Sequence, residues 1–95
     1  MSALDAFRLD DKVAIITGAG KGIGAAIATT FADAGADVVL TARTAADLEA
    51  VAAEVATRGR RALVVPGDVS DVTHVAHVVE RAAEEFGRID ICVSN

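Results

Sequence analysis

A glycine-rich segment between an apolar run and a run of small residues constrains the fold of this chain more than any other feature. Residues 17–24 read Thr-Gly-Ala-Gly-Lys-Gly-Ile-Gly, and they separate the apolar residues 13–16 from residues 25–28, which are alanine and isoleucine. A strand that turns through glycines into a helix is typical of dinucleotide-binding sites. Glycine permits the turn and leaves no Cβ between backbone and ligand. The free N–H groups at the start of the helix favour a pyrophosphate.

Apolar runs and helical patterns alternate along the whole chain. The pattern predicts strands over residues 13–17, 37–42, 62–65 and 89–93, with helices over residues 22–34, between Thr44 and Gly59, and from Ser70 or Asp71 to Gly87. Continuous apolar strands indicate a parallel sheet covered on both faces, and the helices between them are right-handed crossovers. We therefore expect an α/β fold, a Rossmann-type doubly wound parallel sheet of strand order 3-2-1-4. The first two helices should cover one face and the third helix the other.

The spacing of apolar residues predicts which side of each helix faces the sheet. The expected inward residues are Ile23, Ile27, Phe31 and Ala34 in the first helix, Leu48, Val51 and Val55 in the second, and Val72, Val75, Val79, Ala82 and Phe86 in the third. Thr44 and Asp47 have the spacing of a capping box at the start of the second helix.

Three residues that could carry chemistry are better explained by structural roles. His74 and His77 lie three residues apart, but no third metal ligand converges on them, which favours a solvated helix face. Cys92 is the only cysteine and has no internal disulfide partner. Its place in an apolar strand predicts a packed, inert thiol.

Charge and hydropathy exclude several classes of protein. The net charge is −5, and the densest basic stretch, residues 58–61, falls at a predicted helix end, where cations stabilise the helix dipole. We therefore expect no nucleic-acid partner. The chain has neither an export-signal pattern nor 18 consecutive apolar residues, so we expect a cytoplasmic protein without a membrane partner. Hydrophobic residues make up 53% of only 95 residues, which suggests that some of them face neighbours outside the chain.

The glycine spacing distinguishes between phosphate-binding patterns. The general pattern G-x-G-x-x-G/A can be placed on Gly20, Gly22 and Ala25, but it leaves Gly18 unexplained. A Walker-type loop is excluded because Lys21 is followed by Gly22 rather than by serine or threonine. The pattern T-G-x-x-x-G-x-G fits residues 17–24 without remainder. This pattern resembles that of the short-chain dehydrogenase/reductase family.

The resemblance covers the whole chain. Asp68-Val69 is similar to the family's Asp-Val/Leu pair, in which the aspartate holds the adenine amino group; a carboxylate that caps the helix near Ser70 is the alternative. Residues 87–90 match the family's Gly-x-x-Asp, and residues 91–95 resemble the start of Leu-Val-Asn-Asn-Ala-Gly, with Ser94 in place of the first asparagine. The cofactor-binding residues that the resemblance implies are Gly18, Gly20, Lys21, Gly22, Ile23, Gly24, Arg43, Thr44, Asp68, Val69 and Asn95.

The end of the second strand bears on the choice of cofactor. A carboxylate there accepts hydrogen bonds from the adenosine ribose and repels a 2′-phosphate, but position 42 is alanine. Arg43 follows, and it could grip a phosphate together with Lys21. The pair resembles the NADP-preferring branch of the family, so we expect NADP(H) rather than NAD(H). The alternatives for Arg43 are a solvated cation or a guanidinium stacked on adenine in an NAD enzyme.

The catalytic residues of the family lie beyond the matched segment. They are a serine, an assisting asparagine and a Tyr-x-x-x-Lys motif, and this sequence contains no tyrosine. The resemblance thus implies that residues 1–95 are the N-terminal part of one Rossmann domain, inactive alone. The complete protein would be a homo-oligomer, a tetramer or dimer, that transfers hydride between NADP(H) and a small carbonyl or alcohol substrate. A stand-alone nucleotide-binding or regulatory module is the second hypothesis.

Overall fold

The computed structural model describes residues 8–95. Its elements are β1 (Val13–Thr17), α1 (Gly22–Asp33), β2 (Asp37–Thr41), α2 (Ala45–Thr57), β3 (Ala62–Val64), α3 (Val72–Phe86) and β4 (Ile91–Val93). The strands form one parallel sheet of order β3-β2-β1-β4, which confirms the expected α/β topology. The start of the chain, which bears on the argument about an export signal, lies partly outside the described residues. Within residues 8–95, no helix is both long and apolar enough to cross a bilayer.

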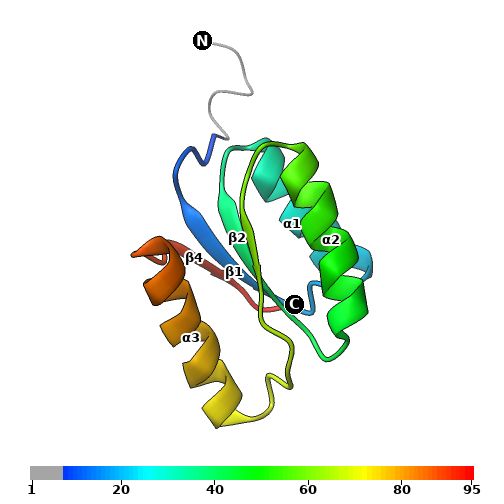
Figure 1. Cartoon of the computed structure of the whole chain (residues 1–95), viewed down its shortest axis with the longest axis vertical. Helices are drawn as coiled ribbons and strands as arrows, with labels where there is room; N and C mark the ends of the chain where they lie inside the picture. Colours follow the sequence, from blue (N-terminus) through cyan, green and yellow to red (C-terminus); the bar gives the residue numbers. More distant parts are fainter. Residues whose placement is uncertain (1–7) are drawn as a thin grey trace.

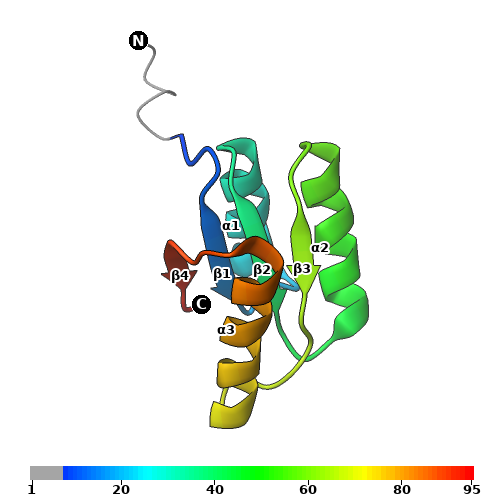
Figure 2. The same cartoon turned by 60° about the vertical axis from the view of Figure 1, so that its left-hand side comes forward.

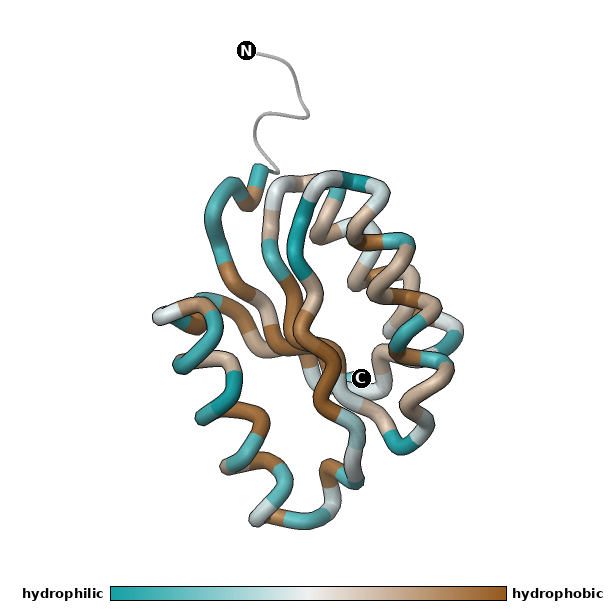
Figure 3. The backbone as a smooth tube through the Cα atoms, in the orientation of Figure 1, coloured by the Kyte–Doolittle hydropathy of each residue, from teal (hydrophilic) through white to brown (hydrophobic). Residues whose placement is uncertain are grey.

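The sheet lies between two helical layers. Helices α1 and α2 cover one face and α3 covers the other, as predicted (Figure 1). Figure 2 shows α3 in front of the sheet and α1 behind it. Ala14 and Ile16 of β1 pack toward α1 and α2, whereas Val13 and Ile15 pack toward α3. Figure 3 shows that the most apolar segments of the chain are the strands between the two helical layers. The central strands β1 and β2 are buried, while the edge strands β3 and β4 are only partly buried.

Helix α1 approaches the sheet through small residues. Its buried residues are Gly24, Ala28 and Ala32, which follow one another at intervals of four. The expectation that Ile23 faces the core is wrong, since its side chain is 72% exposed. A stripe of small residues lets the helix lie close to the strands, and a large side chain on that stripe would hold the two apart.

Helix α3 is turned relative to the prediction. Its buried residues are Val78 and Ala82, whereas Val72, Val75 and Val79 are 82%, 43% and 44% exposed, so their expected place in the core is wrong. The inward stripe runs through positions 74, 78, 82 and 86, and His74 on it is partly buried rather than on a solvated face. Valines occur on both sides of this helix, so apolar spacing alone could not choose between them.

Several local details also differ from the predictions. Strands β2 and β3 end one residue early, at Thr41 and Val64, and β4 begins two residues late, at Ile91. Thr44 is the N-cap of α2, but its side chain makes no capping hydrogen bond, so the expected capping box is absent. Asp71 does cap α3, accepting a hydrogen bond from the Thr73 backbone N–H. Cys92 is exposed rather than packed, because α3 does not extend over that part of β4.

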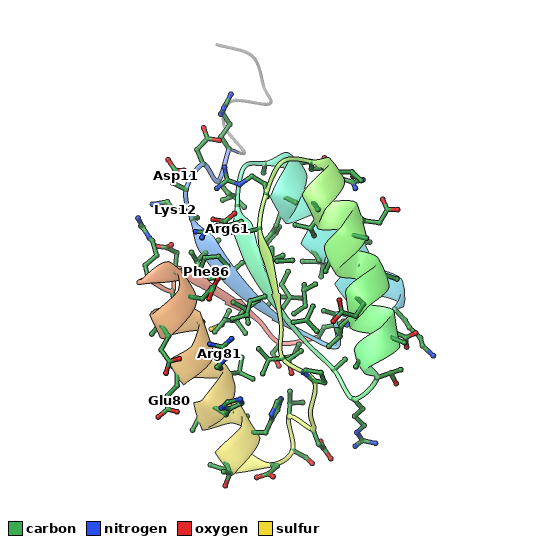
Figure 4. The ribbon with its side chains drawn as sticks, in the orientation of Figure 1. Asp11, Lys12, Arg61, Glu80, Arg81 and Phe86 are labelled. Carbon is green, nitrogen blue, oxygen red and sulfur yellow. The ribbon has the colours of Figure 1, made fainter. Side chains whose placement is uncertain are left out.

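The amino edge of the sheet is held together by paired charges. Asp37, which is 8% exposed, accepts a hydrogen bond of 2.9 Å from the Arg61 backbone N–H and lies 3.2 Å from Nε of Arg60. The Arg61 guanidinium lies 4.7 Å from the centre of the Phe86 ring, which joins the start of β3 to the end of α3 (Figure 4). Of the basic cluster, Arg58 alone acts at the helix end as expected, donating to the Glu54 carbonyl.

Asp90 attaches β4 to the beginning of β1. Its carboxylate accepts hydrogen bonds from the Val13 backbone N–H at 2.9 Å and from two nitrogens of Arg88 at 2.8 Å each. The Arg88 guanidinium and the Val13 N–H both favour the charged carboxylate, and they lower the pKa of Asp90. A carboxyl group whose folded pKa is lowered stabilises the fold fully above its unfolded pKa of about 4 and loses that effect as the pH falls further.

We therefore predict that Asp90→Ala lowers the melting temperature of the full-length protein at pH 7. The difference from wild type should shrink as the pH is taken below about 4, because Asp90 then binds a proton in the unfolded state and, at still lower pH, in the folded state as well. Thermal melts followed by circular dichroism measure both effects, with Glu85→Ala on the exposed face of α3 as the control. A difference that stays constant between pH 7 and pH 3 would contradict a role for the charged form.

Candidate dinucleotide site

All the site residues expected from the sequence lie at the carboxyl edge of the sheet. The glycine loop follows β1, Arg43 and Thr44 follow β2, and Asp68 and Val69 follow β3. Asn95 follows β4. In a parallel sheet these four connections meet at one edge, which is where ligands of doubly wound folds bind. Two backbone hydrogen bonds hold the edge together, from Ala19 N–H to the Thr41 carbonyl at 3.3 Å and from Gly67 N–H to the Ala42 carbonyl at 2.8 Å.

Two turns of the loop need glycine for its backbone freedom. Gly18 has φ +61° and Gly22 has φ +55°, values in the left-handed region where a side chain is strained. Gly22 has open space around it, so its conformation rather than its packing demands glycine.

Gly24 is required for a different reason. It lies within α1, and a Cβ at this position would overlap the Gly18 carbonyl group. The helix can therefore begin directly beneath the loop only if residue 24 has no side chain. This contact explains why the fourth glycine of the pattern lies inside a helix, where glycine is otherwise unfavourable.

Asn95 ties the end of the described chain to the glycine loop. Its side-chain amide donates to the Gly18 carbonyl at 3.2 Å, and its backbone N–H donates to the Thr17 hydroxyl at 3.0 Å. That hydroxyl in turn donates to the Val93 carbonyl at 3.3 Å. Asn95 therefore connects the end of β4 to the glycine loop and lies next to the contact between Gly18 and Gly24.

The start of α1 suits an anionic group. Lys21 is the N-cap residue, its side chain makes no capping hydrogen bond, and the first turn holds no acidic residue. Gly22 and Ile23 are exposed. The first N–H groups of the helix and its positive dipole end are thus open to a ligand above the loop. Together with the open space around Gly22, this fits the pyrophosphate of a dinucleotide.

A carboxylate that the sequence assigned to a helix cap lies beside the loop instead. Asp47 of α2 is 3.7 Å from the Lys21 ammonium. A Cβ on Gly20 would come 2.9 Å from the Asp47 Cβ and 3.8 Å from that of Ala42. Asp47 was expected to complete a capping box, and the contact between the loop and α2 places it here instead.

Arg43 and Asp68 meet across the ends of β2 and β3. The Arg43 guanidinium donates to the Asp68 carboxylate at 3.2 Å, and both side chains are substantially exposed. The other carboxylate oxygen accepts hydrogen bonds from the backbone N–H and the hydroxyl of Ser70, at 2.9 and 2.8 Å. The pKa of Asp68 is lowered mainly by the two hydrogen bonds from Ser70 and to a smaller extent by Arg43. Asp68 is therefore an ionised acceptor that stabilises the turn before α3, but it does not cap the helix, because Asp71 is the N-cap.

The remaining residues of the predicted site, Thr44 and Val69, lie at the surface. Thr44 is exposed at the start of α2, and Val69 is 44% exposed beyond Asp68. Within residues 8–95, no three or more histidine, cysteine, aspartate or glutamate side chains are grouped so that they could hold a metal ion.

His74 is the residue of this edge that sequence reasoning missed. Its Nε2 lies 2.8 Å from the Thr41 hydroxyl, and the two groups form a hydrogen bond. The four-residue spacing does place His74 on the same side of the helix as Val78, Ala82 and Phe86, but the valines on the other side obscure this signal.

Comparison with known proteins agrees with this geometry. The model of the short chain dehydrogenase family matches residues 12–95. The chain belongs to this family. An uncharacterized oxidoreductase of Mycobacterium tuberculosis is 51% identical over 92 residues, which are 97% of this chain and 35% of that protein.

Two solved structures that resemble this chain contain different cofactors. L-sorbose reductase from Gluconobacter frateurii, complexed with NADPH and L-sorbose, is 42% identical with a TM-score of 0.89 over 94% of this chain and 34% of that one. A 7α-hydroxysteroid dehydrogenase complexed with NADH is 40% identical with a TM-score of 0.94, over 100% of this chain and 37% of that one. The chain thus spans about a third of the length of these relatives.

The contact between Gly24 and Gly18 gives a stability prediction. In an ordinary helical position, replacing glycine by alanine stabilises a protein by up to about 1 kcal/mol. At Gly24 we expect the reverse, a loss of about 1–3 kcal/mol, because the new methyl group must displace the Gly18 carbonyl.

Chemical denaturation of the full-length protein measures this effect. Ala26→Gly, on the exposed side of the same helix, is the control and should cost about 1 kcal/mol through helix propensity alone. An unchanged or increased stability of Gly24→Ala would show that helix and loop do not meet so closely.

Proposed function

We propose that residues 1–95 form the N-terminal, cofactor-binding part of one Rossmann domain in an oxidoreductase that transfers hydride between NADP(H) and a small carbonyl or alcohol substrate. The observation that carries the proposal is the Gly24 contact beneath the Gly18 carbonyl, which sets the open start of α1 directly under the glycine loop. Family membership and the share of the relatives that the chain spans support it. We further propose that the complete protein is a homo-oligomer in the cytoplasm.

The residues of this chain would bind and orient the cofactor. Gly22, which has open space around it, would leave room for the pyrophosphate, and the N–H groups of Gly22 and Ile23 would face it. Gly18 and Gly20 would hold the loop in place through their close packing against Asn95 and Asp47. Asp68 and Val69 would lie beside the adenine ring, and the ionised Asp68 carboxylate would accept a hydrogen bond from its amino group. When bound, NADPH supplies the hydride that reduces a carbonyl carbon. Residues 1–95 would hold that cofactor in position, and the catalytic residues would come from the rest of the protein.

The preference for NADP(H) rests on the end of β2. Ala42 offers no carboxylate to the adenosine ribose, and Arg43 and Lys21 are 78% and 81% exposed. Each cation has an acidic neighbour, Asp68 for Arg43 and Asp47 for Lys21, but solvent-exposed pairs of this kind are weak. A phosphate dianion can therefore compete for their N–H groups. Thr44, next to Arg43, would offer its hydroxyl to the same phosphate.

The cofactor preference can be tested by changing Arg43. In the full-length protein we expect tighter binding of NADPH than of NADH. Arg43→Ala should weaken NADPH binding by about tenfold to a hundredfold, because a hydrogen bond between two charged groups is lost, and it should leave NADH binding nearly unchanged. Isothermal titration calorimetry with both cofactors measures this.

Arg81→Ala is the matched control, since Arg81 is an arginine of α3 that pairs with Glu84 instead. Equal wild-type affinities for NADPH and NADH, or an unchanged ratio in Arg43→Ala, would reject the NADP preference. Absence of binding to either cofactor would reject the proposed function itself.

A further inference from the structure

His74 joins the two strand ends that carry the adenosine side of the site. It lies on the inward side of α3, and its Nε2 forms the 2.8 Å hydrogen bond with the hydroxyl of Thr41. Thr41 is 1% exposed and is the last residue of β2. The residues that immediately follow it are Ala42 and Arg43. The imidazole therefore anchors α3 to the point from which Arg43 emerges.

The same imidazole ring packs against the loop after β3. A Cβ on Gly67 would overlap the carbon and nitrogen atoms of the His74 ring, so the ring occupies the place of a side chain at residue 67. Gly67 N–H donates to the Ala42 carbonyl at 2.8 Å, and Asp68 follows directly. One face of the ring thus holds the loop, while its Nε2 holds the strand.

We propose that His74 is a positioning residue that holds the Gly67–Asp68 turn against the end of β2 and so places Asp68 and Arg43 for the adenosine half of the cofactor. The proposal rests on the proposed function, because it assigns the role within that site. His74 itself touches neither the carboxylate nor the guanidinium. Its effect passes through Thr41 on one side and Gly67 on the other.

The geometry predicts which substitutions preserve the contact. The amide of glutamine reaches the position of Nε2, so His74→Gln can keep the hydrogen bond with Thr41. The shorter asparagine reaches only as far as Nδ1, so His74→Asn leaves the Thr41 hydroxyl without this partner. His74→Leu keeps apolar bulk but removes the bond. His77→Leu is the matched control, since His77 is exposed one turn further along the same helix.

Binding of NADPH and of 2′,5′-ADP to the full-length protein tests the proposal, with circular dichroism melts to confirm folding. The second ligand carries the adenosine half and its 2′-phosphate without nicotinamide. We expect His74→Leu and His74→Asn to lower the affinity for both ligands by about fivefold to tenfold, which corresponds to the loss of one hydrogen bond. His74→Gln should restore most of this affinity, and His77→Leu should match wild type.

A double substitution provides an independent measurement. Gly67→Ala should weaken 2′,5′-ADP binding in the wild-type background, because the methyl group must push the imidazole away. It should do so much less when residue 74 is also changed to alanine, and this non-additivity reports the contact directly. Additive effects would overturn the proposal.

The possible results also separate the two proposals. Full-length protein that binds neither NADPH nor NADH would overturn both. Normal binding by wild type together with equal affinities for His74→Leu and His77→Leu would overturn only the role of His74, as would a loss of NADPH affinity without a loss for 2′,5′-ADP.

Discussion

The close approach of α1 to the loop after β1 is the constraint on which the candidate site depends. Because Gly24 has no side chain, the Gly18 carbonyl can lie against the helix, and the first N–H groups of α1 then open directly beneath the loop. Ala28 and Ala32 continue the same stripe and let the helix stay close to the sheet along its length. Asn95 closes the arrangement from the other neighbouring strand through its bond to the Gly18 carbonyl. The open start of α1 beneath the loop is thus a consequence of packing.

The two edges of the sheet use charge in different ways. At the amino edge, Asp37 and Asp90 accept backbone N–H groups and pair with arginines, so their charges are used to fasten β1, β2, β3 and β4 together. At the carboxyl edge, the pairs Lys21–Asp47 and Arg43–Asp68 are more exposed, and they bridge connections rather than strands. Exposed pairs contribute little to stability and exchange partners readily. In the proposed function, their cations would be available to the phosphate of the cofactor.

Apolar patterning predicted the elements well and the helix faces less well. Strand β1 and the four-stranded order follow from the sequence, because long apolar runs separated by amphipathic segments of crossover length leave few topologies open. Spacing assigned the faces of α1 and α3 only in part, since each helix has apolar residues on more than one side. Of the residues expected to face inward, those that do pack against the core include Ile27, Phe31, Ala82 and Phe86. Ile23 and Val72 are exposed because the sheet accepts small residues beneath α1 and covers only the stripe through Val78 and Ala82 beneath α3.

The sequence by itself determined that strands and helices alternate, that a glycine turn joins the first pair, and that Ala42 and Arg43 follow the second strand, because these features depend on local spacing and on residue type. Only the tertiary structure decided the partners of the polar side chains. Asp47 pairs with Lys21 instead of capping its own helix. Arg43 and Asp68, which lie in connections and are 25 residues apart in sequence, form a hydrogen bond. His74, which was expected on the solvated side of α3, contacts Thr41 and packs against Gly67. Such contacts join residues distant in sequence, and their formation depends on how each helix rotates as it packs against the sheet.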